Sequence, residues 1–400
     1  MANRIRVGNR YIGGDEPCFI VAEAGANHEG DFERAKALIA AAVSVRADSI
    51  KFQHYKADRL AAPEAKRYWR VWGDEDNFQF DPDHYKDDQR STFAEIDGIP
   101  REKDAALFRY GDENNILVFS TPFDFESVDH LDALNVPMFK IASGDLTYHQ
   151  FLTYVAKKGR PVVLSTGAAN LDEIKEAVDV IRRTGNDQIV LLHCTLAYPA
   201  PLAHANLLMM RHLAEEFPDL PFGLSDHTPG VAAAVAAAML GATMIEKHFT
   251  HTPGPAAGDR RVGESPDHDI GIGPEQFSEM VKQIRKNEAA GLSSRLGLEL
   301  ARAIEMIKQS KPGCVLGQFE RKQVDPAVEL KARVQARRSV VTNRGLKKGE
   351  RITRETLAGD TFVIKRPGTG VAPYELEKLC GRTIACDLGP DMVLRWEHLL

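Results

Sequence analysis

Residues 162–192, VVLSTGAANLDEIKEAVDVIRRTGNDQIVLL, contain one complete unit of strand, helix and strand. The apolar runs at Val162–Leu164 and Ile189–Leu192 are short and almost uninterrupted, which is typical of strands buried on both faces of a parallel sheet. Between them, Leu171–Ile181 carries its apolar residues at helical spacing, and Asn170 is a favourable residue for capping the first turn. The stretch therefore predicts a βαβ unit.

The same alternation recurs along the first two thirds of the chain. Six further apolar runs predict strands at Phe19–Ala22, Ser49–Phe52, Ile116–Phe119, Met138–Ala142, Phe222–Leu224 and Met244–Ile245. Asp31–Val45 and Val231–Leu240 are among the helices expected between them. Eight strands alternating with helices over about 250 residues predict an α/β fold of the (β/α)8 TIM-barrel type, with a doubly wound open sheet as the main alternative. We favour the barrel because the number of strands reaches eight.

The composition is that of an ordinary globular protein, with 43% hydrophobic residues, 27% charged residues and a net charge of -6. The negative charge argues against nucleic acid as a partner. The five cysteines are scattered and form no CxxC pair, as expected for reduced thiols. No apolar run in the sequence has the length or the flanks of a signal peptide or a membrane span, so a cytoplasmic protein without membrane contact is expected.

Three segments are predicted along the chain. The barrel is expected to occupy residues 1–292, followed by a linker over residues 293–336 and a small β-rich domain over residues 337–400. Strands of the small domain are expected at Ser339–Thr342, Phe362–Lys365 and Thr383–Ala385. Two long segments of the barrel, residues 62–101 and 251–272, follow strand ends and are expected to cover an active site.

Polar side chains gather where the predicted strands end, which in a TIM barrel is the side of the active site. Lys51 and Lys140 each end an apolar strand and would point their ammonium groups into the barrel mouth. Together with neighbouring hydroxyl groups they predict a site for a phosphate and a carboxylate. For either lysine alone, a solvent-exposed ammonium or an ion pair with a nearby acid is the alternative.

Two histidines, His227 and His248, end the seventh and eighth strands. Neighbouring strands bring such imidazoles within reach of one ion, and a catalytic metal needs open positions beside its protein ligands. The alternative is a pair of hydrogen-bonded core histidines. Glu23 ends the first strand and is a candidate acid or base, or else the ion-pair partner of Lys51 or Lys247.

Several stretches resemble the sialic acid synthase family, in the right order over nearly the whole chain. They include IVAEAGANHEG at residues 20–30, ADSIKFQ at 47–53, FSTPF at 119–123, FKIASG at 139–144, GLSDHT at 223–228 and EKHFT at 246–250. The sequences RRS at 337–339 and KRPGTG at 365–370 are similar to the antifreeze-like (SAF) domain of that family. The resemblance implies a TIM barrel joined to a SAF domain, in a domain-swapped homodimer in which the small domain of one chain covers the barrel of the other.

The resemblance also implies an activity. Enzymes of this family join phosphoenolpyruvate to an N-acylated sugar such as N-acetylmannosamine, and they release phosphate and a sialic-type, nonulosonic acid. His227 and His248 match the metal ligands, with Mn2+ as the expected ion and Mg2+, Co2+ or Fe2+ as alternatives. The residues that match phosphoenolpyruvate contacts are Lys51, Thr121, Lys140, Ser143, Ser165 and Ser225. The positions associated with the sugar acceptor are Gln53, Asp145, Tyr198, Asp267 and Arg366, while Glu23 matches the carboxylate near the reacting carbon.

The sugar itself stays open, because the departures from the family pattern face the acceptor. Asp145 stands where the family often has Glu, and Leu196 stands where it often has a polar residue. The segment from 249 to 267 is longer than usual and carries Arg260 and Arg261. Two alternatives therefore remain: another phosphoenolpyruvate-dependent keto-sugar-acid synthase with a different aldose acceptor, and a carbohydrate-binding homologue without catalysis.

Overall fold

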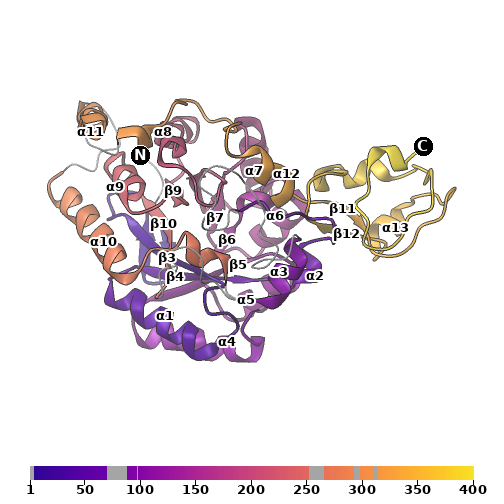
Figure 1. The fold of residues 1–400 in the computed structure, drawn as a ribbon, viewed down its shortest axis with the longest axis horizontal. Helices are drawn as coiled ribbons and strands as arrows, with labels where there is room; N and C mark the ends of the chain where they lie inside the picture. Colours follow the sequence, from indigo (N-terminus) through magenta and orange to yellow (C-terminus); the bar gives the residue numbers. More distant parts are fainter. Residues whose placement is uncertain (1–3, 70–87, 97, 252–264, 292–297, 310–312) are drawn as a thin grey trace.

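Eight parallel strands close into a barrel, in the order β10-β3-β4-β5-β6-β7-β8-β9 (Figure 1). The computed structural model describes residues 4–69, 88–96, 98–251, 265–291, 298–309 and 313–400. The barrel strands are β3 Phe19–Gly25, β4 Ser49–His54, β5 Leu117–Pro122, β6 Phe139–Ile141, β7 Val162–Ser165, β8 Ile189–Cys194, β9 Phe222–Asp226 and β10 Met244–His248. The closed ring confirms the predicted TIM barrel and rules out the open sheet.

Helices pack around the outside of this ring (Figure 1). They are α1 Phe32–Ser44, α4 Arg101–Glu113, α5 Phe125–Ala133, α6 His149–Ala156, α7 Leu171–Arg182, α8 Leu207–Glu216, α9 Ala232–Met239 and α10 Pro274–Ala289. Shorter helices are α2 Ala57–Leu60, α3 Gln89–Glu95 and, in the small domain, α13 Arg354–Ala358. Local signals set the helix ends, as at the predicted cap of α7. There, Asn170 accepts a hydrogen bond from the backbone N–H of Glu173 at 2.9 Å and Glu173 accepts one from the N–H of Asn170 at 3.0 Å.

The N-terminal residues form a hairpin that the sequence pattern did not reveal. Strand β1 (Ile5–Val7) pairs antiparallel with β2 (Arg10–Ile12). Their apolar side chains lie in one buried cluster with Phe19 and Met244, the first residues of β3 and β10. The hairpin therefore covers the amino ends of the strands and leaves the carboxyl ends, where TIM barrels have their active sites, for chemistry.

The segment between the barrel and the small domain is largely helical. It contains α11 (Leu298–Gln309) and α12 (Leu330–Ala336). Arg333 of α12 and Arg337, which follows it, form ion pairs with Glu173 of α7 at 2.7 and 2.6 Å. These pairs tie the end of the connecting segment to the barrel.

Replacing Glu173 by glutamine is expected to destabilise the fold at neutral pH and to matter less in acid. Burial works against ionisation of Glu173, but hydrogen bonds from Arg333 and Arg337 outweigh it and lower its pKa from 4.5 to about 2. Because the folded state has the lower pKa, the stabilisation is fully present above the unfolded pKa and is lost as the pH falls toward 2. The difference in free energy of unfolding between protein and variant, measured in urea, should shrink by roughly 1 kcal/mol from pH 7 to pH 4. Equal differences at the two pH values would contradict this.

Residues 337–400 form a small domain that projects from the side of the barrel (Figure 1). It contains an antiparallel pair, β11 (Ser339–Thr342) and β12 (Phe362–Lys365), as predicted. The expected third strand at Thr383–Ala385 is wrong. Its residues make isolated bridges to two different segments of the domain, so no continuous ladder forms.

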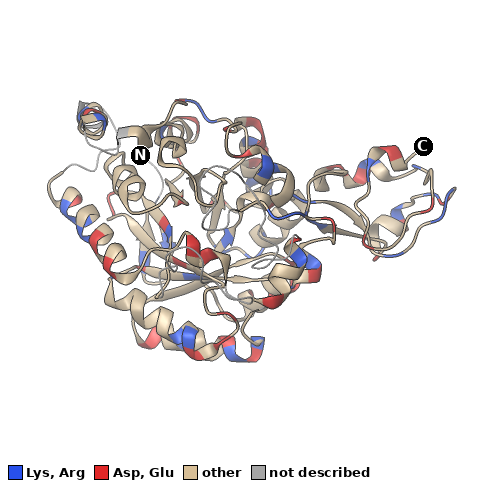
Figure 2. Ribbon diagram, viewed as in Figure 1, with Lys and Arg blue, Asp and Glu red and all other residues tan. Residues whose placement is uncertain are grey.

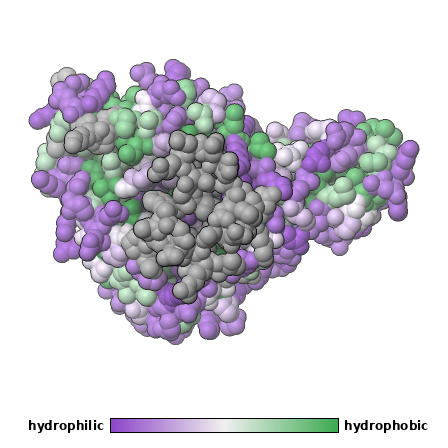
Figure 3. Space-filling view, viewed as in Figure 1, coloured by the Kyte–Doolittle hydropathy of each residue, from purple (hydrophilic) through white to green (hydrophobic). Residues whose placement is uncertain are grey.

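Charged residues occupy the outer faces of the barrel helices and the surface of the small domain (Figure 2). Hydrophilic residues likewise dominate the coloured part of the face shown in Figure 3. Within the described ranges, the structure contains no helix that is both long and apolar enough to span a membrane. Buried charged residues are the exception to this surface pattern, and several of them meet at the carboxyl ends of the barrel strands.

Candidate active site

A cavity of about 110 Å³ opens where the barrel strands end. The predicted site residues that line it are Glu23, Lys51, Gln53, Thr121, Lys140, Ser143, Ser165, Tyr198, Ser225, His227, His248, Asp267 and Arg366. Asp145 is the one predicted residue that is absent from this lining. The closed ring explains the gathering, since residues far apart in the sequence reach the same end of the barrel.

The floor of the cavity holds two lysines and two glutamates. Lys51 Nζ lies 2.6 Å from a carboxylate oxygen of Glu23 and donates a hydrogen bond to Thr121 Oγ1 at 3.0 Å. Lys140 Nζ lies 3.4 Å from a carboxylate oxygen of Glu246. The four charged side chains are at most 5% exposed. Their charges balance in a site screened from bulk water, and both ammonium groups are already in place for an anionic substrate.

Burial and neighbouring charges act against each other in this cluster. Burial lowers the pKa of Lys140. Burial also works to lower the pKa of Lys51, but the charges of Glu23 and Glu246 outweigh it, so that this pKa is raised. Burial raises the pKa of Glu23 despite the attraction of Lys51. Glu23 is therefore the carboxyl group best suited to hold a proton, and Lys51 is the ammonium group that keeps its charge most firmly.

Glu246 is a site residue that the predicted set lacked. Alternate residues of β10 face the cavity, so Glu246 and His248 line it, whereas Lys247 turns to the other face and donates to Asp226 at 2.9 Å. Ser225 donates a hydrogen bond to Glu246 at 2.9 Å. The two-residue period that places His248 at the site was the signal that would have placed Glu246 there as well.

His227 and His248 lie side by side, with ring centroids 5.4 Å apart. The Nδ1–H of His227 donates to the carbonyl oxygen of Thr195 at 3.0 Å, so its Nε2 carries the free lone pair. Nδ1 of His248 is buried without a hydrogen-bond partner in the described part of the chain, and it lies 3.9 Å from a carboxylate oxygen of Asp267. Burial lowers the pKa of His227 to about 4 and the pKa of His248 well below 6.5, so both rings are neutral at neutral pH.

These groups fit a divalent metal ion. A neutral imidazole offers the lone pair that such an ion needs, and ligation would give the buried Nδ1 of His248 a partner. Donor atoms of Glu23, His248 and Asp267 also lie within 4.8 Å of one another. Two hydrogen-bonded core histidines, the alternative interpretation, would account for His227 but would leave Nδ1 of His248 unexplained.

Aromatic side chains form the wall beside the histidines. Tyr198 packs on His227 with ring centroids 4.1 Å apart. Tyr68 and Trp69, from the segment 62–101 that was predicted to cover the site, also line the cavity. An aromatic wall with a few polar groups opposite it is typical of sites for small molecules, and it suits the apolar face of a sugar ring.

The second predicted covering segment reaches the cavity through Asp267. Residues 70–87 of the first segment lie outside the described residues, and so do residues 252–264 of the second. The latter range includes Arg260 and Arg261.

Arg366 brings the small domain into the site of its own chain. Its backbone N–H donates to the carbonyl oxygen of Leu60 at 3.0 Å, and the residue forms a parallel bridge with Ala61. Its guanidinium donates to Gln89 Oε1 at 3.1 Å. The expected domain-swapped arrangement, in which the small domain covers the barrel of a partner chain, stays a prediction. The homodimer itself stays a prediction.

Asp145 faces away from the cavity. Its two oxygens accept hydrogen bonds from Arg338 at 2.5 and 3.2 Å, and the two side chains are 0% and 2% exposed. Arg338 also donates to the carbonyl oxygen of Phe123 at 2.8 Å. Asp145 therefore anchors the start of the small domain to the barrel, and its contact with the sugar acceptor stays a prediction. Leu196, the other departure from the family pattern, does line the cavity.

Comparison with known proteins finds relatives along the whole chain. The model of the NeuB family matches residues 38–294, and that of the SAF domain matches residues 337–400. The chain is 34% identical over 403 residues to N,N'-diacetyllegionaminic acid synthase of Legionella pneumophila, which covers 98% of this chain and 99% of that protein. It is 33% identical over 290 residues to N-acetylneuraminate-9-phosphate synthase of Homo sapiens, covering 70% of this chain and 73% of the relative.

Solved structures agree with the fold. The spore coat polysaccharide biosynthesis protein SpsE of Bacillus subtilis superposes with a TM-score of 0.75 at 31% identity, covering 100% of this chain and 99% of that one. The N-acetylneuraminic acid synthetase of Leptospira borgpetersenii, solved with citrate, superposes with a TM-score of 0.62 at 28% identity, covering 77% and 98%. With both family models matched in order along the sequence, the chain belongs to the NeuB family and carries a SAF domain.

Proposed function

We propose that the protein condenses phosphoenolpyruvate with the aldehyde of an N-acylated amino sugar, giving a nonulosonic acid and phosphate. The observation that carries the proposal is the pair Lys51 and Lys140, buried among hydroxyl groups in the cavity that also holds two neutral histidines. Relatives that synthesise N,N'-diacetyllegionaminic acid and N-acetylneuraminate 9-phosphate support this class of product.

The lysines and hydroxyl groups suit a donor that carries a phosphate and a carboxylate. Thr121 already accepts a hydrogen bond from Lys51. Ser165 Oγ, by contrast, is buried and has no hydrogen-bond partner among the described residues. A buried hydroxyl group without a partner is costly unless a ligand supplies one, so Ser165 is available to donate to an oxygen of the donor.

A divalent ion, which we propose to be Mn2+ with Mg2+, Co2+ or Fe2+ as alternatives, would be held by His227 and His248. When bound, it supplies a Lewis acid that polarises the aldehyde of the acceptor. The protein's part is to keep both imidazoles neutral and oriented. Thr195 fixes the tautomer of His227, and burial keeps both rings unprotonated.

Glu23 is positioned to accept the proton of the water that enters the reaction. Carbon 3 of phosphoenolpyruvate forms a bond to the aldehyde carbon, whose oxygen takes up a proton and becomes a hydroxyl group. Water adds at carbon 2 and gives up one proton. The bond from carbon 2 to the phosphate oxygen then breaks, the added hydroxyl group loses its proton to leave a ketone, and phosphate is released. Glu23 accepts a hydrogen bond from Gln53 at 3.0 Å, and its raised pKa suits it to take the proton of that water. Holding both substrates in line in this cavity would lower the entropic cost of the condensation.

The proposal includes a homodimer, which the resemblance to sialic acid synthases implies. Tyr374 and Trp396 of the small domain are 49% and 41% exposed and offer apolar contacts to a second chain. In the domain-swapped form of this dimer, the small domain of one chain would cover the barrel of the other.

Release of phosphate from phosphoenolpyruvate is expected to require Mn2+ and one acceptor from a panel of N-acyl hexosamines, their 6-phosphates and plain aldoses. Lys140→Met should raise the KM for phosphoenolpyruvate by about 100-fold, because it removes a buried charge that pairs with the donor. Lys157→Met is the matched control, since Lys157 is exposed on the outside of the barrel and should leave KM unchanged.

The panel also separates the alternatives. Release that depends on a plain aldose would identify a different keto-sugar-acid synthase in place of a nonulosonic acid synthase. No release with any acceptor, together with no binding of phosphoenolpyruvate in calorimetry, would overturn the proposal.

A further inference from the structure

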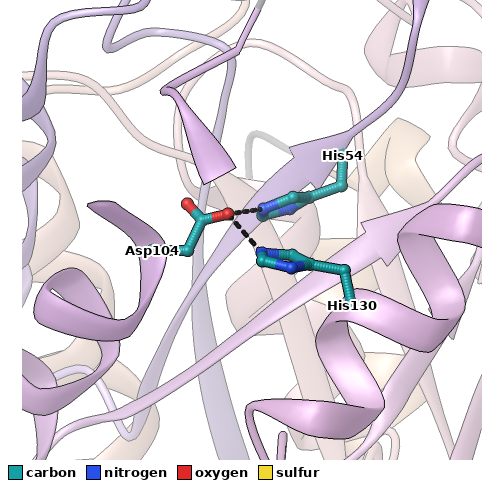
Figure 4. Close-up of side chains that lie close together, drawn as sticks. All are labelled: His54, Asp104 and His130. Carbon is teal, nitrogen blue, oxygen red and sulfur yellow. Dashed lines mark hydrogen bonds and ion pairs between the residues drawn. The ribbon is translucent and has the colours of Figure 1, made fainter. Parts of the chain in front are cut away.

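A second cluster of ligand-type side chains lies outside the barrel wall, apart from the active site. His54 is the last residue of β4, Asp104 lies on α4 and His130 lies on α5. Figure 4 shows both imidazoles turned toward one oxygen of the carboxylate. Nε2 of His54 is 3.0 Å and Nε2 of His130 is 2.7 Å from Oδ2 of Asp104. Three secondary-structure elements therefore bring three donor atoms to one point.

The spacing of these atoms is close to that of a metal site. Bonds of about 2.0–2.1 Å at tetrahedral angles place neighbouring ligand atoms about 3.3 Å apart. All three donor atoms of the cluster lie within 4.8 Å of one another. An ion would need the two distances to Asp104, 3.0 and 2.7 Å, to lengthen by a few tenths of an ångström, which side-chain rotation supplies.

The outer partner of His54 supports a ligand role. Nδ1 of His54 lies 2.7 Å from Ser120 Oγ on β5. While Nε2–H donates to Asp104, the serine hydroxyl group donates to Nδ1; once an ion takes the lone pair of Nε2, the same hydroxyl group can turn to accept the Nδ1–H. Histidine ligands in metalloproteins are held in this way by a second hydrogen bond.

The burial of the Asp104 carboxylate is a further argument for a cation at this position. Its side chain is 1% exposed, and among the described residues its ion pairs are those with His54 and His130. A buried carboxylate is costly unless a positive charge is nearby. A divalent ion between the three groups would supply it.

The cluster borders a cavity with room for further ligands. His54 and Asp104 line a cavity of about 220 Å³. Three protein ligands leave one position of a tetrahedral ion for water, which this space can hold. Two imidazoles and one carboxylate favour a transition metal over Mg2+ or Ca2+, which prefer oxygen ligands.

We propose that His54, Asp104 and His130 bind a divalent transition-metal ion of the Zn2+ class, at a site separate from His227 and His248. The ion ties α4 and α5 to the end of β4. His54 follows Gln53 and Ser120 precedes Thr121, and both of these neighbours line the active-site cavity. The site therefore stiffens the wall of the cavity from behind without contacting the substrates.

Zn2+ binding to the full-length chain, stripped of metal with EDTA and titrated by calorimetry, tests the proposal. The double variant His227→Ala/His248→Ala removes the active-site imidazoles, and it is expected still to bind one Zn2+ per chain. Adding His130→Gln should weaken this binding by more than about 100-fold, because the amide can still donate to Asp104 but is a poor ligand. Adding His149→Gln, on α6, is the matched control and should change nothing.

Thermal unfolding gives a second readout that does not depend on catalysis. Zn2+ should raise the melting temperature of the double variant, because an ion that binds the folded chain stabilises it by mass action. It should not raise the melting temperature once His130→Gln is added. A double variant that binds no Zn2+, or that binds it equally well with His130→Gln, would show the cluster to be a hydrogen-bonded triad. Neither outcome of the Zn2+ experiments bears on phosphate release, so the proposed second metal site and the proposed condensation activity can each be refuted without the other.

Discussion

Replacing His227 with alanine is expected to lower the rate of condensation by about 1,000-fold, which corresponds to about 4 kcal/mol of lost transition-state stabilisation. The ring occupies the cavity with its Nε2 lone pair free and its Nδ1–H held by Thr195. Among the described residues that line the cavity, His248 is the only other imidazole, and it already belongs to the same site. Steady-state phosphate release with saturating Mn2+ measures the loss.

The same variant should bind Mn2+ more weakly, which calorimetry or metal analysis after gel filtration can show. His149→Ala is the matched control, because His149 lies on α6 outside the barrel and stacks on Tyr374. Far-UV circular dichroism checks that both variants are folded. A folded His227→Ala protein with unchanged turnover would remove the histidines from the mechanism.

Replacing Arg338 with alanine is expected to destabilise the protein by about 3–5 kcal/mol. The change leaves the carboxylate of Asp145 buried at 0% exposure with its ion-pair partner gone. It also removes the donor to the carbonyl oxygen of Phe123. Because Arg338 stands at the start of the small domain, the loss should appear as earlier release of this domain in urea, which hydrogen exchange of residues 337–400 can follow.

The double variant Arg338→Met/Asp145→Leu separates charge from packing. A buried ion pair replaced by apolar residues of similar size is often neutral, so this variant should recover most of the stability that Arg338→Ala loses. Arg344→Ala is the surface control: Arg344 is 47% and its partner Glu350 27% exposed, so this pair should matter by less than about 1 kcal/mol. If Arg338→Ala were as stable as Arg344→Ala, the ion pair between Arg338 and Asp145 would contribute nothing to the free energy of unfolding.

The barrel and most of its site were predictable because their signals are local. Apolar runs such as Val162–Leu164 mark buried strands, and the residue at the end of each run must lie at the barrel mouth once the ring closes. Lys51, Lys140 and His248 were found in this way. The cap of α7 by Asn170 was equally visible, since it depends on residues three positions apart.

The parts that were missed depend on contacts between distant segments. Asp145 looks like a site residue by its position after β6, but its direction is set by Arg338, which lies 193 positions away. The pairing of Arg366 with Ala61 is likewise invisible in any short window of sequence. Glu246 is the exception. It lies two residues before His248 on the same strand, so the alternation of side chains along a strand is enough to place it in the cavity.

The pairing of Ala61 with Arg366 has a consequence for how such a protein changes over time. One continuous chain supplies both the floor of the cavity and an arginine of its wall. The barrel and the small domain therefore cannot each be exchanged for that of a relative without loss of the contacts between them. A recombination event between relatives that cuts near residue 337 would separate Asp145 from Arg338 and Ala61 from Arg366 in a single step. Lineages are therefore expected to inherit the two parts together and to adjust them in concert.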